Sequence, residues 1–158
     1  MEHAFDEVNG VVETVSGFTG GRVKNPSYKQ VSRGGTGHAE VVQIRYNPEI
    51  VSYEELLNAF WRNIDPTTPD RQFCDVGDQY RPAVFFHDAE QKQLAQKSKA
   101  NIEQTKTFAE SVATGIERLA EFYPAEDYHH KKPLKYKFYR KLCGRDKRLR
   151  ELWGEQTS

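Results

Sequence analysis

The chain has 158 residues, the length of a single domain, and its composition excludes several classes of protein. Lysines plus arginines and aspartates plus glutamates both number 23, so the net charge of zero gives no sign of a nucleic-acid or membrane partner. A hydrophobic content of 37%, with 12% aromatic residues, is typical of a folded protein and not of a disordered one. No apolar run is long enough to span a membrane and no signal peptide follows Met1, so we expect a cytoplasmic protein with reduced cysteines.

The first half of the chain alternates between helical and extended patterns. Residues 1–8 have the pattern of the end of a helix, and the β-branched residues of 11–18 predict a strand. Residues 22–37 are polar and rich in glycine and proline, which is typical of a functional loop, and residues 38–46 alternate as a strand does. Residues 52–55 form a capping box at the start of a helix. The apolar residues of that helix share one face: Leu56, Leu57, Phe60, Trp61 and Ile64.

The second half of the chain predicts two more strands and two more helices. Residues 65–66 (DP) end the preceding helix, and residues 81–86 form a strand. Asp88 is the predicted N-cap of a long polar helix that runs to about residue 107. Residues 112–122 hold a last strand, and residues 146–153 a short terminal helix. Loosely alternating strands and helices with long loops favour an α+β fold, a two-layer α/β sandwich, over a doubly wound sheet.

Residues 1–158 therefore form one expected domain, in which residues 125–158 are an extended, basic, coil-rich C-terminal segment. Residues 131–150 contain ten lysines and arginines and one acidic residue, interleaved with aromatic residues. Such a segment can follow a phosphate backbone and stack on bases, so nucleic-acid binding is one alternative function. We favour the other interpretation, in which the aromatic residues pack on the core and the lysines face water, and we expect no nucleic-acid partner.

Several side chains fit acid-assisted chemistry on an oxygen atom. Glu40, on the predicted strand 38–46, can donate a proton if a partly apolar pocket keeps its carboxyl group protonated, although a lone strand glutamate usually faces solvent. Tyr28 and Tyr80 can hold an oxygen on which charge builds, and Asp75 can orient a tyrosine or a water molecule. His38 can contact a substrate, but such a histidine more often satisfies the backbone of a loop.

The two cysteines lie in different surroundings. Cys143 suits a recycling thiol, because Lys141 and Arg145 favour its thiolate; the alternative is a passive surface thiol. Cys74 lies next to Asp75, whose negative charge raises the pKa of a thiol, so we favour a buried or half-buried structural cysteine over a nucleophile. Two distant cysteines do not make a zinc site, and the chain has no phosphate loop and no dinucleotide fingerprint. We expect neither a metal nor a cofactor.

Nine short segments, taken in chain order, resemble the peptide methionine sulfoxide reductase A family. They are residues 16–21 (SGFTGG), 25–28 (NPSY), 36–41 (TGHAEV), 53–57 (YEELL), 60–61 (FW), 65–67 (DPT), 77–81 (GDQYR), 122–129 (FYPAEDYH) and 136–139 (YKFY). The resemblance implies a ferredoxin-like sandwich and reduction of the S epimer of methionine sulfoxide, free or in proteins, as repair of oxidative damage. Thioredoxin is the implied electron donor, and we expect a monomer.

The same resemblance assigns roles to individual residues. The family's proton-donating glutamate corresponds to Glu40, its two oxygen-binding tyrosines to Tyr28 and Tyr80, and its supporting aspartate to Asp75. A cysteine in the region of Cys143 recycles the enzyme in related proteins. Residues 129–133 resemble a family segment from which several residues are deleted, so the geometry of that loop is expected to differ.

One family motif does not occur in this sequence. The nucleophilic cysteine of the family lies in Gly-Cys-Phe-Trp, between a first strand and a helix, and corresponds to a position just before Met1. Three interpretations stay open: a start placed too late or a shortened chain, a paralogue that keeps the scaffold, and a selenocysteine codon read as a stop. A paralogue that keeps the scaffold would bind oxidised methionine without reducing it. Without the first strand an unpaired sheet edge remains, so we expect marginal stability.

Overall fold

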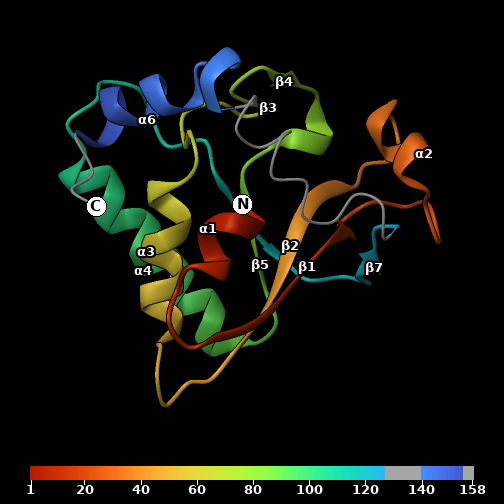
Figure 1. Ribbon diagram of the computed structural model, residues 1–158, viewed down its shortest axis with the longest axis horizontal. Coiled ribbons are helices and arrows are strands. Elements are labelled where there is room, and N and C mark those ends of the chain that lie inside the picture. Colours follow the sequence, from red (N-terminus) through yellow and green to blue (C-terminus); the bar gives the residue numbers. More distant parts are fainter. Residues whose placement is uncertain (127–139, 155–158) are drawn as a thin grey trace.

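The computed structural model describes residues 1–126 and 140–154. Helix α1 (Glu2–Asp6) leads into strand β1 (Val11–Thr19), which pairs antiparallel with β2 (Ala39–Tyr46). The short strand β7 (Tyr123–Pro124) pairs antiparallel with β1, which gives the order β2-β1-β7. Figure 1 shows the long β1–β2 pair crossing the molecule, with α1 packed beside it. The predicted patterns at 1–8, 11–18 and 38–46 are all confirmed.

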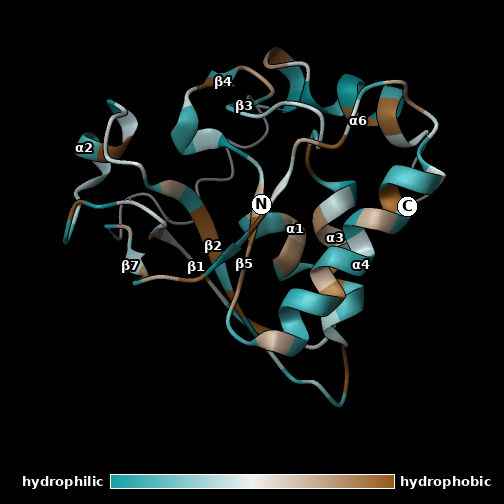
Figure 2. Ribbon diagram, turned by 180° about the vertical axis from the view of Figure 1, so that it is seen from behind, coloured by the Kyte–Doolittle hydropathy of each residue, from teal (hydrophilic) through white to brown (hydrophobic). Residues whose placement is uncertain are grey.

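A second, parallel pair of strands is formed by β5 (Ala83–Phe86) and β6 (Gly115–Arg118). Parallel strands need a crossover, and α4 (Ala89–Thr105) provides it. Asp88 caps this helix as predicted: its carboxylate accepts a hydrogen bond of 2.8 Å from the Gln91 amide. Most of α4 is hydrophilic in Figure 2, and Ala95 is its buried residue.

Helix α3 (Tyr53–Arg62) packs against α4. Its predicted capping box is present: Ser52 Oγ accepts from the Glu55 amide at 3.1 Å, and the Glu55 carboxylate accepts from the Ser52 amide at 2.8 Å. The helix ends at Arg62, earlier than predicted, because the Asn63 amide side chain donates to the Ala59 carbonyl at 2.8 Å and closes the last turn. The main core joins both helices and consists of Leu57, Trp61, Ile64, Ala95 and Val112.

Four short elements went unpredicted besides β7. They are α2 (Tyr28–Ser32), inside the predicted loop, β3 (Arg71–Gln72), β4 (Asp75–Val76) and the 3₁₀ helix η1 (Asp78–Tyr80). Elements of two to five residues are too short to show a periodicity, so the sequence pattern could not reveal them. The terminal helix α6 (Arg145–Trp153) begins one residue before its predicted start.

The elements form a two-layer α+β arrangement, as predicted. In Figure 1, helices α3, α4 and α6 gather on one side, β1, β2 and β7 lie on the other, and β5 runs between them. Within the described residues, no helix combines the length and the apolar character needed to cross a membrane. The shortened segment 129–133 and the aromatic run 136–139 lie outside the described residues.

Candidate active site

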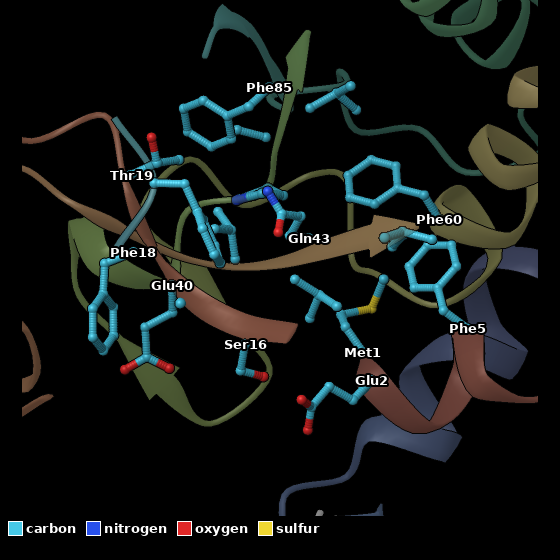
Figure 3. A pocket seen from close by; sticks show the side chains of 18 of the residues that line it. Met1, Glu2, Phe5, Ser16, Phe18, Thr19, Glu40, Gln43, Phe60 and Phe85 are labelled. Atoms are coloured by element: carbon cyan, nitrogen blue, oxygen red, sulfur yellow. The ribbon is translucent and has the colours of Figure 1, made fainter. Parts of the chain in front are cut away.

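A cavity of about 880 Å³ lies between β2 and β5. Four predicted site residues line it together: Tyr28, Glu40, Asp75 and Tyr80. They come from four different elements, α2, β2, β4 and η1, so the tertiary structure brings together residues that are far apart in the sequence. Figure 3 shows this cavity, with Glu40 next to Phe18, its cross-strand partner on β1.

Tyr28 is placed by the short helix α2. Ser27 caps this helix in a capping box with Gln30, and the Tyr28 amide donates to the Glu126 carboxylate at 3.3 Å. Val31, which is completely buried, packs with Phe18 and Ala125 and holds the helix on the sheet. The glycine- and proline-rich loop therefore contains a fixed helical turn that carries the tyrosine to the cavity wall.

Tyr80 ends η1, which is tied to α2. The Gln79 side chain is buried and donates through Nε2 to the Ser32 carbonyl at 3.2 Å, so the segments bearing the two tyrosines are linked. Burial and then the negative charges of Glu40 and Asp75 together raise the pKa of Tyr80 to about 12. The phenol stays protonated at neutral pH and can donate a hydrogen bond to an oxygen atom in the cavity.

Glu40 lines the cavity but remains exposed to solvent. The sequence argument for its role assumed a partly apolar pocket that keeps the carboxyl group protonated. This structure does not provide such a pocket. The cavity runs along the open side of β2 and leaves Glu40 uncovered.

His38 satisfies the backbone of a loop, the second of its two predicted roles. Its side chain is buried, Nδ1 accepts from the Gly21 amide at 3.1 Å, and Nε2 lies 2.7 Å from the Val23 carbonyl. Because Nδ1 accepts, Nε2 must carry the proton and donate to the carbonyl. A side chain on Gly21 would overlap His38, so glycine is required there.

The two cysteines form a disulfide, which corrects two predictions. Cys74 and Cys143 are 69 residues apart in sequence, and their Cα atoms lie 5.1 Å apart. The expectation of reduced thiols is wrong for this structure, because the β3–β4 turn and the start of α6 bring the two residues together. Cys74 is also exposed, not buried or half-buried, since it lies at the tip of that turn. Neither cysteine lines the cavity.

The cavity wall also contains polar residues that were not predicted as site residues, among them Ser16, Gln43 and Arg81. Gln43 carried a signal, because it is a polar residue among the valines and isoleucine of β2. Arg81 pairs with Glu117 at 3.3 Å and donates to the Asp78 carbonyl at 3.0 Å, which fixes η1 beside the cavity. Among the described residues, no group of three or more histidine, cysteine or acidic side chains is arranged to hold a metal ion.

Comparison with known proteins shows which family this chain resembles. The family model described as "Peptide methionine sulfoxide reductase" matches residues 1–157. A "Peptide methionine sulfoxide reductase MsrA" of Halalkalibacterium halodurans is 45% identical over 98% of this chain and 90% of its own length. A "Peptide methionine sulfoxide reductase MsrA/MsrB" of Vibrio cholerae is 45% identical over 97% of this chain, which spans 42% of that relative.

A solved structure gives the same result. The methionine sulfoxide reductase A of Corynebacterium diphtheriae superposes with a TM-score of 0.78 and 36% identity, covering 84% of this chain and 69% of that one. Sequence and fold agree over nearly the whole length, and the chain belongs to the peptide methionine sulfoxide reductase family.

Proposed function

We propose that this fold reduces the S epimer of methionine sulfoxide, free or in proteins, with Glu40, Tyr28, Tyr80 and Asp75 as its acid and oxygen-binding residues. A thiolate bonds to the sulfoxide sulfur while Glu40 gives a proton to the oxygen, and the products are methionine and a sulfenic acid. Tyr28 and Tyr80 hold the oxygen as charge builds on it, and Asp75 orients them. The observation that carries the proposal is the convergence of these four residues on one cavity.

The thiolate must come from a group that reaches this cavity, and the shape of the cavity favours a strand. Residues 40–46 of β2 and 81–85 at β5 line it without interruption. Successive side chains of a strand point to opposite faces, so an uninterrupted lining means that the cavity follows the edge of each strand. Among the described strands, β2 pairs only with β1 and β5 only with β6.

We propose that this groove takes a strand that precedes α1 and carries the family's Gly-Cys-Phe-Trp motif. Met1 and Glu2 line the cavity, and Figure 3 shows Met1 beside Phe5 and Phe60, so a chain extended at Met1 enters the groove directly. A strand placed there pairs with the free edges of β2 and β5 and covers Glu40. That burial would supply the apolar surroundings that Glu40 lacks in this structure.

The nucleophilic cysteine, now a sulfenic acid, must then be returned to a thiol. The Cys143 thiol attacks the sulfenic sulfur, water leaves and a disulfide forms, which thioredoxin reduces in the cytoplasm. The start of α6 lies near the start of α1: burial and then the charge of Arg145 lower the pKa of the Met1 amine to about 6. This supports a short path from Cys143 to a cysteine placed before Met1.

The test is dithiothreitol-driven reduction of S-methionine sulfoxide. The 158-residue chain is compared with a chain extended at Met1 by the preceding strand and Gly-Cys-Phe-Trp, and with a matched Gly-Ser-Phe-Trp extension. We expect turnover only from the cysteine extension, and a kcat about 10² to 10⁴-fold lower when Glu40→Gln is added to it. Equal turnover by the serine extension or by the 158-residue chain would show that another group is the nucleophile.

A further inference from the structure

A second, smaller hollow of about 470 Å³ lies beside the candidate active site. Its wall consists of Gly20, Gly21, Arg22, Gly35, Gly37 and Asp78. None of these six residues belongs to the wall of the larger cavity, and none has a part in the proposed chemistry. Reduction of the sulfoxide therefore does not account for this hollow.

The hollow and the active-site cavity share a wall at the end of strand β1. Thr19, the last residue of β1, lines the cavity, and Gly20 after it lines the hollow. The position that a Cβ would take at Gly20 is 3.1 Å from a guanidinium nitrogen of Arg81, a residue of the cavity wall. Glu40 pairs across the strands with Phe18, and Figure 3 shows Phe18, Thr19 and Glu40 at one end of the cavity. The hollow therefore adjoins the end of the cavity that holds the candidate acid.

The distance between the two hollows suits neighbouring residues of one extended peptide. Gly37 precedes Glu40 by three residues, and Asp78 precedes Tyr80 by two. Three residues of chain span at most about 10 Å, so the Cα atoms of each pair are no farther apart than this. Two or three residues of an extended substrate cover the same distance. A protein substrate with its oxidised methionine in the cavity can therefore lay its neighbouring residues over the hollow.

Two opposite charges belong to the wall of the hollow without pairing with each other. Within the described part of the chain, the Arg22 guanidinium donates to the Gly35 carbonyl at 3.4 Å and forms no ion pair, and the Asp78 carboxylate has no hydrogen-bond partner. A guanidinium has five N–H donors and a carboxylate accepts through both oxygens, so each group has unused capacity. The hollow thus offers a ligand both a donor and an acceptor.

The rest of the wall consists of glycines, which lets another main chain approach closely. Gly20 has a φ of 85°, where a side chain would be strained and would also crowd Arg81. An extended peptide presents one N–H and one C=O group per residue, which matches a wall with one acceptor and one donor. An anion would be repelled by Asp78 and a cation by Arg22. These features favour a neutral main chain as the ligand.

We propose that the hollow binds the main chain of a protein substrate two or three residues away from the oxidised methionine. A substrate carbonyl accepts from the Arg22 guanidinium, and a substrate amide donates to the Asp78 carboxylate. Free methionine sulfoxide is too short to reach this hollow while its sulfoxide is in the cavity. The proposal rests on the proposed function, and it makes peptides better ligands than the free amino acid.

Peptide binding to the 158-residue chain tests the proposal without any need for turnover. Isothermal titration calorimetry compares a glycine–serine nonapeptide that has a central S-methionine sulfoxide with the single residue capped as its N-acetyl N-methylamide. We expect the nonapeptide to bind about tenfold more tightly, as two charge-assisted hydrogen bonds at an exposed site would give. Equal dissociation constants, or no detectable binding of the nonapeptide, overturn the proposal.

A pair of double variants tests the two charged residues. Arg22→Ala with Asp78→Ala should weaken nonapeptide binding about tenfold, to the level of the capped residue. Glu90→Ala with Lys97→Ala is the matched control, because both residues are exposed on α4, line neither hollow, and leave the net charge equally unchanged. The capped residue should bind both variants alike. Equal nonapeptide affinity in the two variants refutes the site.

A change of peptide sequence separates main-chain from side-chain recognition. Nonapeptides with glutamate or with lysine two and three residues from the sulfoxide should bind within about threefold of the glycine–serine peptide, because the main chain is the same. A glutamate peptide that binds much more tightly, and loses this gain in Arg22→Ala, would mean that the hollow recognises acidic side chains. That result overturns the proposal.

Activity gives a separate measurement in the chain extended with Gly-Cys-Phe-Trp. There, Arg22→Ala with Asp78→Ala should lower kcat/KM about tenfold more for the nonapeptide than for free methionine sulfoxide. An equal loss for both substrates overturns the proposal. An extended chain that does not turn over refutes the proposed function, whereas the calorimetric comparison tests the hollow by itself.

Discussion

Reduction of the Cys74–Cys143 disulfide is expected to lower the free energy of unfolding of this chain by about 4 kcal/mol. The cross-link joins residues 69 positions apart and so restricts a large part of the unfolded chain. The chain-entropy model for a loop of that length gives roughly 4 kcal/mol at 25 °C. The stability of a typical domain is about 5–15 kcal/mol, and we expect this chain to lie at the low end, because β2 and β5 each have one unpaired edge among the described strands. Reduction should therefore remove a large share of its stability.

Urea unfolding followed by far-UV circular dichroism measures this difference. With a slope of about 2 kcal/mol/M, the reduced chain should reach its midpoint about 2 M lower than the oxidised chain. Its slope should also be steeper, because the unfolded chain without a cross-link exposes more surface. The control is a Cys74→Ser and Cys143→Ser double variant, whose curve should not respond to dithiothreitol. Superimposable curves for the oxidised and reduced chain would refute the reasoning, since they would mean that the cross-link does not restrict the unfolded chain.

Three further substitutions have expected outcomes. Asp65→Asn should lower the free energy of unfolding at pH 7 by about 1–3 kcal/mol, because Asp65 is buried and accepts from Arg148 at 2.8 Å. Burial raises the pKa of Asp65, but hydrogen bonds from Thr67 and Arg148 outweigh it and leave the pKa lowered, so this stabilisation should fade below about pH 4. His38→Ala should cost about 2 kcal/mol, because it leaves two partly buried backbone groups, the Gly21 amide and the Val23 carbonyl, without their partner. Tyr80→Phe in the extended chain should lower kcat about 10²-fold, and with the pKa of Tyr80 at about 12, its ionisation should cause no loss of activity up to about pH 10.

Each of these has an outcome that contradicts it. Urea midpoints of the chain and its Asp65→Asn variant that differ as much at pH 3 as at pH 7 would exclude the ionised pair as the source of stability. An unchanged midpoint in His38→Ala, with a raised KM in the extended chain, would give His38 a substrate contact instead of a structural role. Full activity of Tyr80→Phe would remove Tyr80 from the oxygen-binding site.

The elements with local signals could be predicted from the sequence. The capping box at Ser52 and Glu55 and the N-cap Asp88 depend on side chains that reach the backbone three residues away, so a short stretch of sequence contains the whole interaction. The alternation of residues 38–46 likewise identifies β2, although it does not show which side of that strand is left open.

The sequence also singled out the candidate site residues through the resemblance of their motifs, but it could not predict their surroundings. That Tyr28, Glu40, Asp75 and Tyr80 share a cavity depends on how α2, β2, β4 and η1 pack. The exposure of Glu40 and the raised pKa of Tyr80 depend on burial and on neighbouring charges, which are properties of the assembled wall.

By itself, then, the sequence determined the family, the main helices and strands, and the chemistry of single side chains. Only the tertiary structure decided that the cavity follows two open strand edges, that His38 serves a loop backbone, and that Cys74 pairs with Cys143 at the surface. The physical reason is the range of the interactions. Caps and periodicities act over a few residues, whereas a disulfide across 69 residues and a cavity built by four elements exist only once the chain has folded.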